Sequence, residues 1–384
     1  MSDSRDAAAP VADAAATSAG VLPYQALRAL VRSGEIAADE PIADAQVQPA
    51  SLDLRLGSVA WRVRASFLPG AKRTVARRIE DLGLHRIDLS RDAVLEKGCV
   101  YVVPLQERLT LGERIGGFAN PKSSTGRIDL FTRLIADHAV DFDAVPTGYA
   151  GPLYAEIFPR AFSVVVRKGS RLNQLRFVRG TPGIGALGLR HMLDDHSLLD
   201  RALSETEMRT LARGVPLSVD LAGIGGSDLI GFCARKHAPL IDVDAVGAYD
   251  PREYWEPIRR SDSRAIILDP DDFYILASRE SVAVPVDVAA EMVPYDALTG
   301  EFRAHFAGFF DPGFGLREAG GAGTRAVLEV RPYGVPFLIE DGQLVGRLKY
   351  ERLTDRPDRL YGQGIGSSYQ SQGLALSRHF RPWA

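Results

Sequence analysis

The sequence predicts a mostly β protein built from two tandem copies of one domain. Short alternating segments such as "FSVVVR" and "AVLEVRP" are separated at close intervals by Gly, Pro and Asp, and longer segments of the first half return in the second. Alternation of apolar and polar residues is typical of half-buried strands, and frequent turn residues between such strands are typical of a sandwich or barrel.

The internal repeat is visible both in the similar residues of the two copies and in the constant spacing between matched positions. "ASLDLRLG" (50–57) returns as "LSVDLAG" (217–223), and the segment beginning "LYAEIFPR" (153–177) returns as the one beginning "AVLEVRPY" (326–350). A shared offset at many chemically matched positions indicates duplication of one folding unit. Five pairs have an offset of 173 residues and two have an offset of 167, which implies small insertions and deletions: Tyr101/Tyr274, Glu107/Glu280, Pro121/Pro294, Glu156/Glu329 and Gly169/Gly342, then Asp53/Asp220 and His138/His305.

Helix is expected in two places. Residues 23–36 carry apolar side chains at helical spacing and precede the first β segment, and residues 191–214 form a helical stretch closed by Gly214. The expected organisation is a disordered tail (1–20), a first β domain (21–185), a helical connector (186–214), a second β domain (215–355) and a C-terminal tail (356–384).

Composition excludes several classes of partner. The chain of 384 residues has 46 Lys and Arg against 49 Asp and Glu, so no overall positive field attracts nucleic acid, and the cationic, aromatic segment "REYWEPIRR" (252–260) is interpreted as an inserted surface segment. No apolar run reaches membrane-spanning length, and the N-terminus lacks the pattern of a secretory signal. With two cysteines, a cytoplasmic protein with no membrane and no nucleic-acid partner is expected.

The segment "NPKSSTGR" (120–127) concentrates hydroxyls and cations between two expected strands. One interpretation is a surface turn. The other is an anion-binding turn, because Lys122, Ser123, Ser124 and Arg127 offer hydroxyls, backbone N–H groups and two positive charges to a phosphate chain.

These pieces together resemble the dCTP deaminases, a family with the trimeric dUTPase-like β fold. The matching motifs span most of the chain: "QPASLDLRLG" (48–57), "PKSSTGR" (121–127), "YAGPLYAEI" (149–157), "KGSRLNQLRF" (168–177), "DPGFG" (311–315), "VLEV" (327–330) and "SYQSQGLALSR" (368–378). The resemblance implies two tandem dUTPase-like β-barrel or jelly-roll domains joined by the helical connector. It separates dCTP deaminase from dUTPase less sharply, because the two share the Ser-Ser turn and the Asp-Leu strand.

The resemblance also implies roles for individual residues. Lys122, Ser123, Ser124 and Arg127 match the triphosphate-binding turn, and the strand glutamate, Glu156 or Glu329, matches the general acid/base. Further matches to the nucleotide site are Asp143, Asp311, Tyr369 and Gln372. The last two lie in an arm that is expected to close over the nucleotide, so removal of residues 366–384 is expected to abolish turnover and leave the fold intact.

The two copies differ in which motifs they keep. The second copy has Tyr295, Asp296, Ala297 and Gly300 where the first has the phosphate-binding residues, whereas the first copy keeps Asp143 in an atypical loop. We therefore expect a composite site, with Lys122, Ser123, Ser124 and Arg127 from the first copy and Asp311, Glu329, Tyr369 and Gln372 from the second. The rival is a set of like-with-like contacts, in which the first copy pairs only with another first copy and uses Glu156 and Asp143.

The implied reaction is hydrolytic deamination of dCTP to dUTP. The H-x-E and P-C-x-x-C signature of zinc deaminases is absent from the sequence, so no zinc is expected, and Mg²⁺ is expected to arrive with the substrate triphosphate. Three alternatives stay open: a dUTP pyrophosphatase that uses Asp143 or Asp311, a bifunctional enzyme, and an inactive nucleotide-binding regulator. Assembly into a homo-oligomer is also left open.

Overall fold

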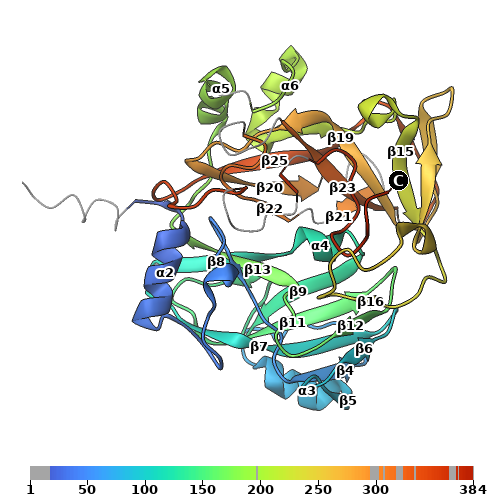
Figure 1. The fold of residues 1–384 in the computed structure, drawn as a ribbon. Helices are drawn as coiled ribbons and strands as arrows, with labels where there is room; N and C mark the ends of the chain where they lie inside the picture. The colour runs from blue at the N-terminus through green and yellow to red at the C-terminus, as the bar shows by residue number, and fades with distance from the viewer. Residues whose placement is uncertain are drawn as a thin grey trace, which may run out of the picture.

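The structure is a computed structural model that describes residues 18–195, 198–294, 302–305, 308–316, 323–332, 334–362, 369–370 and 372–383. Figure 1 shows two β-rich units, the first (blue to green) below and the second (yellow to red) above. The regular elements are mostly strands, which confirms the predicted class. In the described part of the chain, no helix is both long and apolar enough to cross a membrane.

The first unit consists of three sheets. The largest has the strand order β5-β4-β7-β11-β9 with β2 added at β7, the second has the order β1-β13-β8-β10 with β3 added at β13, and the smallest joins β6 and β12. The strands are β1 (Gly20–Val21), β2 (Ile36–Ala38), β3 (Leu52–Asp53), β4 (Val59–Val63), β5 (Gly83–Asp88), β6 (Ala93–Leu95), β7 (Val100–Thr110), β8 (Ile115–Pro121), β9 (Leu130–Ala136), β10 (Ala144–Val145), β11 (Ala150–Pro159), β12 (Val164–Val166) and β13 (Asn173–Arg179).

The second unit repeats this topology. Its sheets have the orders β17-β15-β19-β23-β21, β14-β25-β20-β22 and β18-β24, which match the three sheets of the first unit except that β1 and β2 have no counterpart among the described strands. The strands are β14 (Val215–Ser218), β15 (Leu229–Ala234), β16 (Ile241–Asp242), β17 (Trp255–Arg259), β18 (Ala265–Leu268), β19 (Tyr274–Val282), β20 (Val288–Pro294), β21 (Phe302–His305), β22 (Phe309–Phe310), β23 (Thr324–Pro332), β24 (Phe337–Glu340) and β25 (Leu344–Arg352).

Matched residues of the repeat make the same hydrogen bonds in both units. The hydroxyl of Tyr101 accepts a hydrogen bond from the backbone N–H of Glu96, and that of Tyr274 accepts one from Asp269, both at 2.9 Å. Glu107 accepts the backbone N–H of Arg55 and Glu280 accepts that of Ser218, both at 2.8 Å. These buried polar groups find the same partners twice, as a duplicated unit requires.

The register of the strands corrects two pairings inferred from the sequence. Because Arg55 and Ser218 occupy equivalent positions, the offset in this segment is 163, so Asp53 corresponds to Pro216 and Asp220 to Gly57. The second unit has no carboxylate at the position of Asp53. His305 and His138 are not equivalent either. His305 pairs with Glu329, and Arg133 pairs with the equivalent Glu156, so His305 corresponds to Arg133.

The predicted N-terminal helix is α2 (Tyr24–Ser33), which buries Leu27 and Leu30 and ends at Gly34 with a left-handed φ of 82°. A second helix, α3 (Val75–Leu82), lies in the segment between β4 and β5. Glycine stabilises the C-terminus of α2 because a left-handed φ costs it no steric strain.

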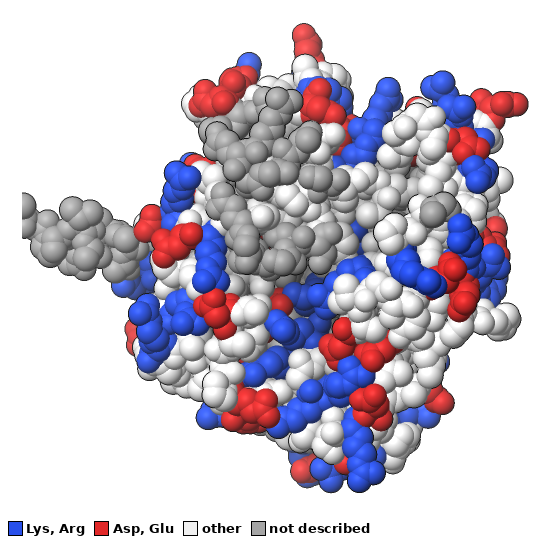
Figure 2. Space-filling model, in the orientation of Figure 1, with Lys and Arg blue, Asp and Glu red and all other residues white. Residues whose placement is uncertain are grey.

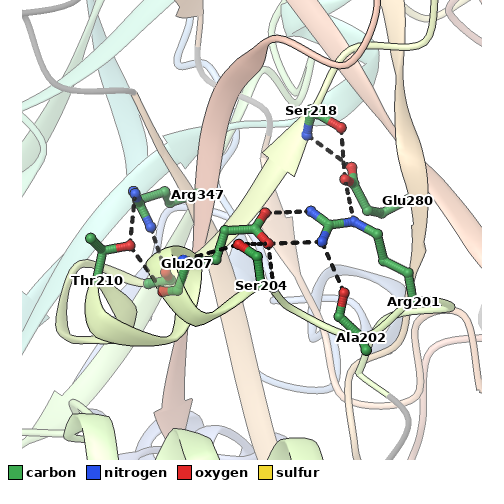
Figure 3. A network of polar contacts seen from close by, with 9 residues as sticks. Arg201, Ala202, Ser204, Glu207, Thr210, Ser218, Glu280 and Arg347 are labelled. Atoms are coloured by element: carbon green, nitrogen blue, oxygen red, sulfur yellow. Dashed lines mark hydrogen bonds and ion pairs between the residues drawn. The ribbon is translucent and has the colours of Figure 1, made fainter.

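The connector is helical in three short pieces, α5 (Ala186–Asp195), α6 (Glu205–Arg209) and a 3₁₀ turn (Leu211–Arg213) that ends at Gly214. Within the connector Arg201 pairs with Glu207, and the same arginine ties the connector to the second unit through the buried Glu280, which also accepts bonds from Ser218 (Figure 3).

One hairpin connection has different paths in the two units. Residues 64–82 join β4 to β5 and fold back over their own unit, where the hydroxyl of Ser66 donates to Glu156. Residues 235–254 join the equivalent strands β15 and β17, but β16 within them crosses to the first unit and pairs with β12 in parallel. Residues 252–260 are therefore not a surface insertion: β17 is an edge strand of the sheet, and the side chain of Trp255 is fully buried.

The two units share a continuous apolar core across their seam. One cluster of buried side chains contains Phe162 and Ile157 of the first unit together with Trp255, Phe273 and Val327 of the second. Burial of this size is the main stabilising term in folding, so the units hold a fixed relation to one another.

Candidate functional site

A cavity of about 530 Å³ lies at the seam of the two units. Figure 2 shows Lys and Arg side chains gathered across the middle of this face, between the units. Eight of the ten residues proposed from the sequence line this cavity: Lys122, Ser123, Ser124, Arg127, Asp311, Glu329, Tyr369 and Gln372.

The first unit supplies the floor through α4 (Ser123–Gly126), a single helical turn between β8 and β9. Lys122 precedes it in an extended conformation, so the turn begins with unpaired donors. Within the described residues, neither the backbone N–H nor the hydroxyl of Ser123 has a hydrogen-bond acceptor, and the same holds for the N–H of Ser124. A turn with free donors at its N-terminal end suits an anion.

Positive charge surrounds this turn. Lys122 Nζ lies 2.5 Å from Asp53 Oδ1, and Arg171 lies 3.6 Å from the other oxygen of the same carboxylate. The buried Arg127 lies under the ring of Tyr369, with its guanidinium carbon 3.8 Å from the ring centre, and its Nε has no hydrogen-bond partner among described residues. One aspartate thus faces three cations, which leaves a net positive wall for phosphate.

Glu329 of β23 enters the cavity from the second unit. Its side chain is 2 % exposed, and Oε2 has no hydrogen-bond partner in the described structure. The carboxylate packs directly over Gly126, where an added Cβ would overlap both carboxylate oxygens. Burial raises the pKa of Glu329 well above its usual value, opposed by Arg127 and reinforced by Asp129, so the site favours the neutral acid over the carboxylate.

Asp311 follows β22 and also lines the cavity. Burial raises its pKa to about 6, Arg176 and Lys122 oppose this, and Asp53 adds to it. Asp311 is therefore mostly ionised at neutral pH. Two carboxyls with raised pKa values in one cavity are a common arrangement in active sites.

The C-terminal tail forms a wall of the cavity that is fixed at its end. Gln372 donates to the backbone oxygen of Arg325, and the hydroxyl of Ser377 donates to the backbone oxygen of Ser124 at 2.8 Å. Phe380 is buried among aromatic rings that include Tyr254. Residues 372–383 thus contact both units, and we expect deletion of residues 366–384 to expose this cluster and to lower stability.

Sequence reasoning missed the contribution of the crossing segment. Asp244 and Val246 follow β16 and line the cavity, and Asp244 is held by Arg167 and by the hydroxyl of Ser170, both at 2.6 Å. The backbone N–H of Gly247 donates to the oxygen of Arg378, another lining residue, so this segment also holds the tail. The sequence-based interpretation of this region concerned only residues 252–260, and nothing in the sequence of residues 241–247 shows that they cross to the other unit.

Glu156 and Asp143 lie outside the cavity. Glu156 is buried beneath residues 64–82, and Asp143 accepts the backbone N–H of Leu134 at 2.7 Å. The sequence suggested that Asp143 corresponds to Asp311, but strand register places Pro146 at that position. Within one chain, Glu156 and Asp143 are therefore not brought into the cavity that holds the anion-binding turn.

Tyr295, Asp296, Ala297 and Gly300, the second copy's counterparts of the anion-binding turn, lie outside the described residues. Across the part of the chain that is described, His, Cys, Asp and Glu form no group of three or more that could hold a metal ion.

Two family models match the chain. The model of the N-terminal domain of 2′-deoxycytidine 5′-triphosphate deaminase matches residues 18–181, and the model of its C-terminal domain matches residues 189–380. The chain belongs to the dCTP deaminase family.

Similar proteins agree with this membership. A solved structure of 2′-deoxycytidine 5′-triphosphate deaminase from Agrobacterium tumefaciens is 50% identical, with a TM-score of 0.83 over 87% of this chain and 99% of that chain. A "dCTP deaminase, dUMP-forming" from Beutenbergia cavernae is 31% identical over 151 residues, 37% of this chain and 75% of the relative. Another from Halobacterium salinarum is 34% identical over 142 residues, 36% of this chain and 67% of the relative. The two family models together match both halves of this dCTP deaminase family member.

Asp143→Asn should stabilise the protein at alkaline pH. Desolvation raises the pKa of Asp143 to about 7, so the folded state holds a proton that the unfolded chain releases near pH 4. Stability conferred by this group is present below pH 4 and is lost as pH rises to 7. Asparagine accepts the same bond and tolerates the φ of 62° at this position.

In thermal melts the midpoint of Asp143→Asn should exceed that of wild type by at least about 2 °C at pH 8 and by less at pH 5. Asp271→Asn is the matched control, since Asp271 also has a left-handed φ of 65° but is exposed. Equal pH dependence in Asp143→Asn and wild type would contradict the assignment.

Proposed function

We propose that the chain hydrolyses the amino group from the cytosine of dCTP in the seam cavity, giving dUTP and ammonia. The observation that carries the proposal is the pairing of an anion-binding turn from one unit with a buried, unpartnered carboxyl from the other in a single cavity. The triphosphate and the pyrimidine of one nucleotide need these two chemistries in the same cavity.

The nucleotide is oriented by charge. Its triphosphate, with the Mg²⁺ it carries, lies against Ser123, Ser124, Lys122 and Arg127, and its base points toward Glu329. The hydroxyls and N–H groups of the turn supply hydrogen bonds, and the guanidinium fork of Arg127 suits phosphate oxygens. The tail residues Tyr369 and Gln372 close the cavity over the ligand.

Glu329 carries protons between water and substrate. The neutral acid first protonates N3 of the ring, and the carboxylate so formed takes a proton from water as the oxygen bonds to C4. That proton passes to the amino nitrogen, which leaves as ammonia, and the carboxylate then removes the remaining hydroxyl proton as the C4 carbonyl forms. The raised pKa of Glu329 supports a starting state that is already protonated.

The finer architecture is part of the same proposal. Each unit is a dUTPase-like β barrel of the jelly-roll type, and the two arose by duplication with the division of labour set out above. The repeated sheet orders and the complementary retention of site residues support this. Homo-oligomer formation and a cytoplasmic location stay predictions.

A second function, hydrolysis of dUTP onward to dUMP and pyrophosphate, is favoured by the names of the relatives from B. cavernae and H. salinarum. Asp311 is the carboxylate placed to activate water near the phosphates, because it lines the cavity and is mostly ionised at neutral pH. Asp143 has no access to that cavity.

One experiment separates these functions. The protein is incubated with dCTP and, separately, with dUTP, and ammonia and pyrophosphate are measured in both. Ammonia from dCTP without pyrophosphate supports the deaminase, and both products from dCTP support the bifunctional enzyme. Pyrophosphate from dUTP without ammonia from dCTP, or nucleotide binding without either product, would overturn the main proposal in favour of a pyrophosphatase or a regulator.

Glu329→Gln should lower kcat for dCTP by about 10²–10⁴-fold, because glutamine can neither give nor take the proton. Glu156→Gln is the matched control, since Glu156 occupies the equivalent strand position but lies outside the cavity. Its kcat should stay within about twofold of wild type. A loss of activity in Glu156→Gln with full activity in Glu329→Gln would reverse the assignment of the two units.

Gly126→Ala should also inactivate the protein although alanine favours helix. The new methyl group would overlap the Glu329 carboxylate and push it out of the position it holds over the turn. We expect kcat/KM to fall at least 100-fold, which corresponds to a loss of about 2.7 kcal/mol of transition-state stabilisation. Gly185→Ala, where an added Cβ meets no atom within 4 Å, should behave as wild type, and normal kinetics in Gly126→Ala would count against the close packing of Glu329.

A further inference from the structure

Arg176 is a fully buried arginine on β13, at the seam and behind the cavity. It does not line the cavity. Its guanidinium lies 3.5 Å from Asp311 and 3.2 Å from Glu351, and donates to the backbone oxygen of Ala290 at 3.3 Å. A buried guanidinium requires partners of this kind, because an unpaired buried charge is strongly destabilising.

All of these partners belong to the second unit, whereas Arg176 belongs to the first. The ring of Phe309, which lines the cavity, also packs on the guanidinium, with 3.9 Å from the guanidinium carbon to the ring centre. Arg176 therefore holds both the β22 strand and the carboxylate that follows it. The contact fixes where Asp311 stands relative to the anion-binding turn.

The duplication provides an internal comparison. The strand register places Lys349 at the position of Arg176, and Lys349 is exposed. The same register places Pro146 at the position of Asp311 and Val178 at that of Glu351. The arginine and its two carboxylates therefore occur only in the combination of units that meets at the cavity, in the same way as the anion-binding turn and Glu329.

We infer that Arg176 is a positioning residue of this site: it orients the Asp311 carboxylate toward the cavity so that Asp311 can accept a hydrogen bond from the bound nucleotide. The inference rests on the proposed function, because it takes the cavity to be the nucleotide site. The role differs from a purely structural ion pair, since Glu351 alone could neutralise Arg176.

The charges around Asp311 give this role a measurable signature. Arg176 and Lys122 favour the ionised form of Asp311, while burial and Asp53 favour the neutral form, and Tyr361 packs nearby on the tail side. Without Arg176, the pKa of Asp311 must rise above its value of about 6. Protonated Asp311 then cannot accept the bond, so nucleotide binding weakens on the acid side first.

The test compares Glu351→Gln with the double variant Arg176→Gln/Glu351→Gln. The single variant keeps the contact of Arg176 with Asp311, and the double variant removes both buried charges together so that neither is left unpaired. The measurements are kcat and KM for dCTP from pH 5 to pH 9, with thermal melts to compare stability.

In the double variant we expect a KM at least tenfold higher than in Glu351→Gln at pH 7, and a midpoint of the acid limb of kcat/KM at least one pH unit higher. Lys349→Gln, at the equivalent exposed position, should match wild type. Identical pH profiles in the single and double variants would overturn the inference and leave Arg176 a structural residue.

Two further measurements keep the outcome clear. If the double variant does not fold, Arg176→Lys is used, which keeps the charge but loses the fork that reaches two carboxylates, and an unchanged KM in Arg176→Lys would then contradict the role. If wild type does not turn over dCTP, the proposed function fails separately. The affinity for dCTP across the same pH range, measured by calorimetry, then tests Arg176 on binding alone.

Discussion

The close packing of the Glu329 carboxylate against the backbone at Gly126 is the constraint on which the site depends. It removes the carboxyl from water, which raises its pKa, and it requires a residue without a side chain in the turn below. The seam must close tightly for this contact to exist. Arg331, two residues after Glu329, forms a buried ion pair with Asp129, three residues after Gly126. This ion pair fixes the same two segments together.

Each unit contributes one part of the site. In each unit, the position equivalent to the part contributed by the other unit is covered by further residues of the chain. In the first unit residues 64–82 close over Glu156, which corresponds to Glu329. In the second unit the connector closes over Arg347, which corresponds to the cavity residue Gln174 and donates to the backbone oxygen of Gly214. Covered surface of this kind cannot receive a nucleotide, so among the residues described the anion-binding turn and the strand glutamate meet in the seam cavity.

Much of this was predictable from sequence, and the failures have a common physical cause. The repeat, the turn at residues 122–127 and the role of the second unit's Glu329 appear as local patterns of letters. The equivalence of Asp143 with Asp311 was wrong because loop insertions shift register, and only strand pairing shows that Pro146 holds the position. Asp244 reaches the cavity on a segment that crosses to the other unit, and Gly126 packs against Glu329. Both contacts join residues far apart in the chain, which a single sequence does not reveal.

The covalent link between the two units has a consequence for how the site responds to dilution. A site shared between separate chains falls apart when the protein is diluted below the dissociation constant of the assembly. Here the two contributing walls belong to one polypeptide and share an apolar core, so their encounter is intramolecular and has a constant effective concentration. Occupancy of the pocket should depend on nucleotide alone, whatever larger assembly the chain joins.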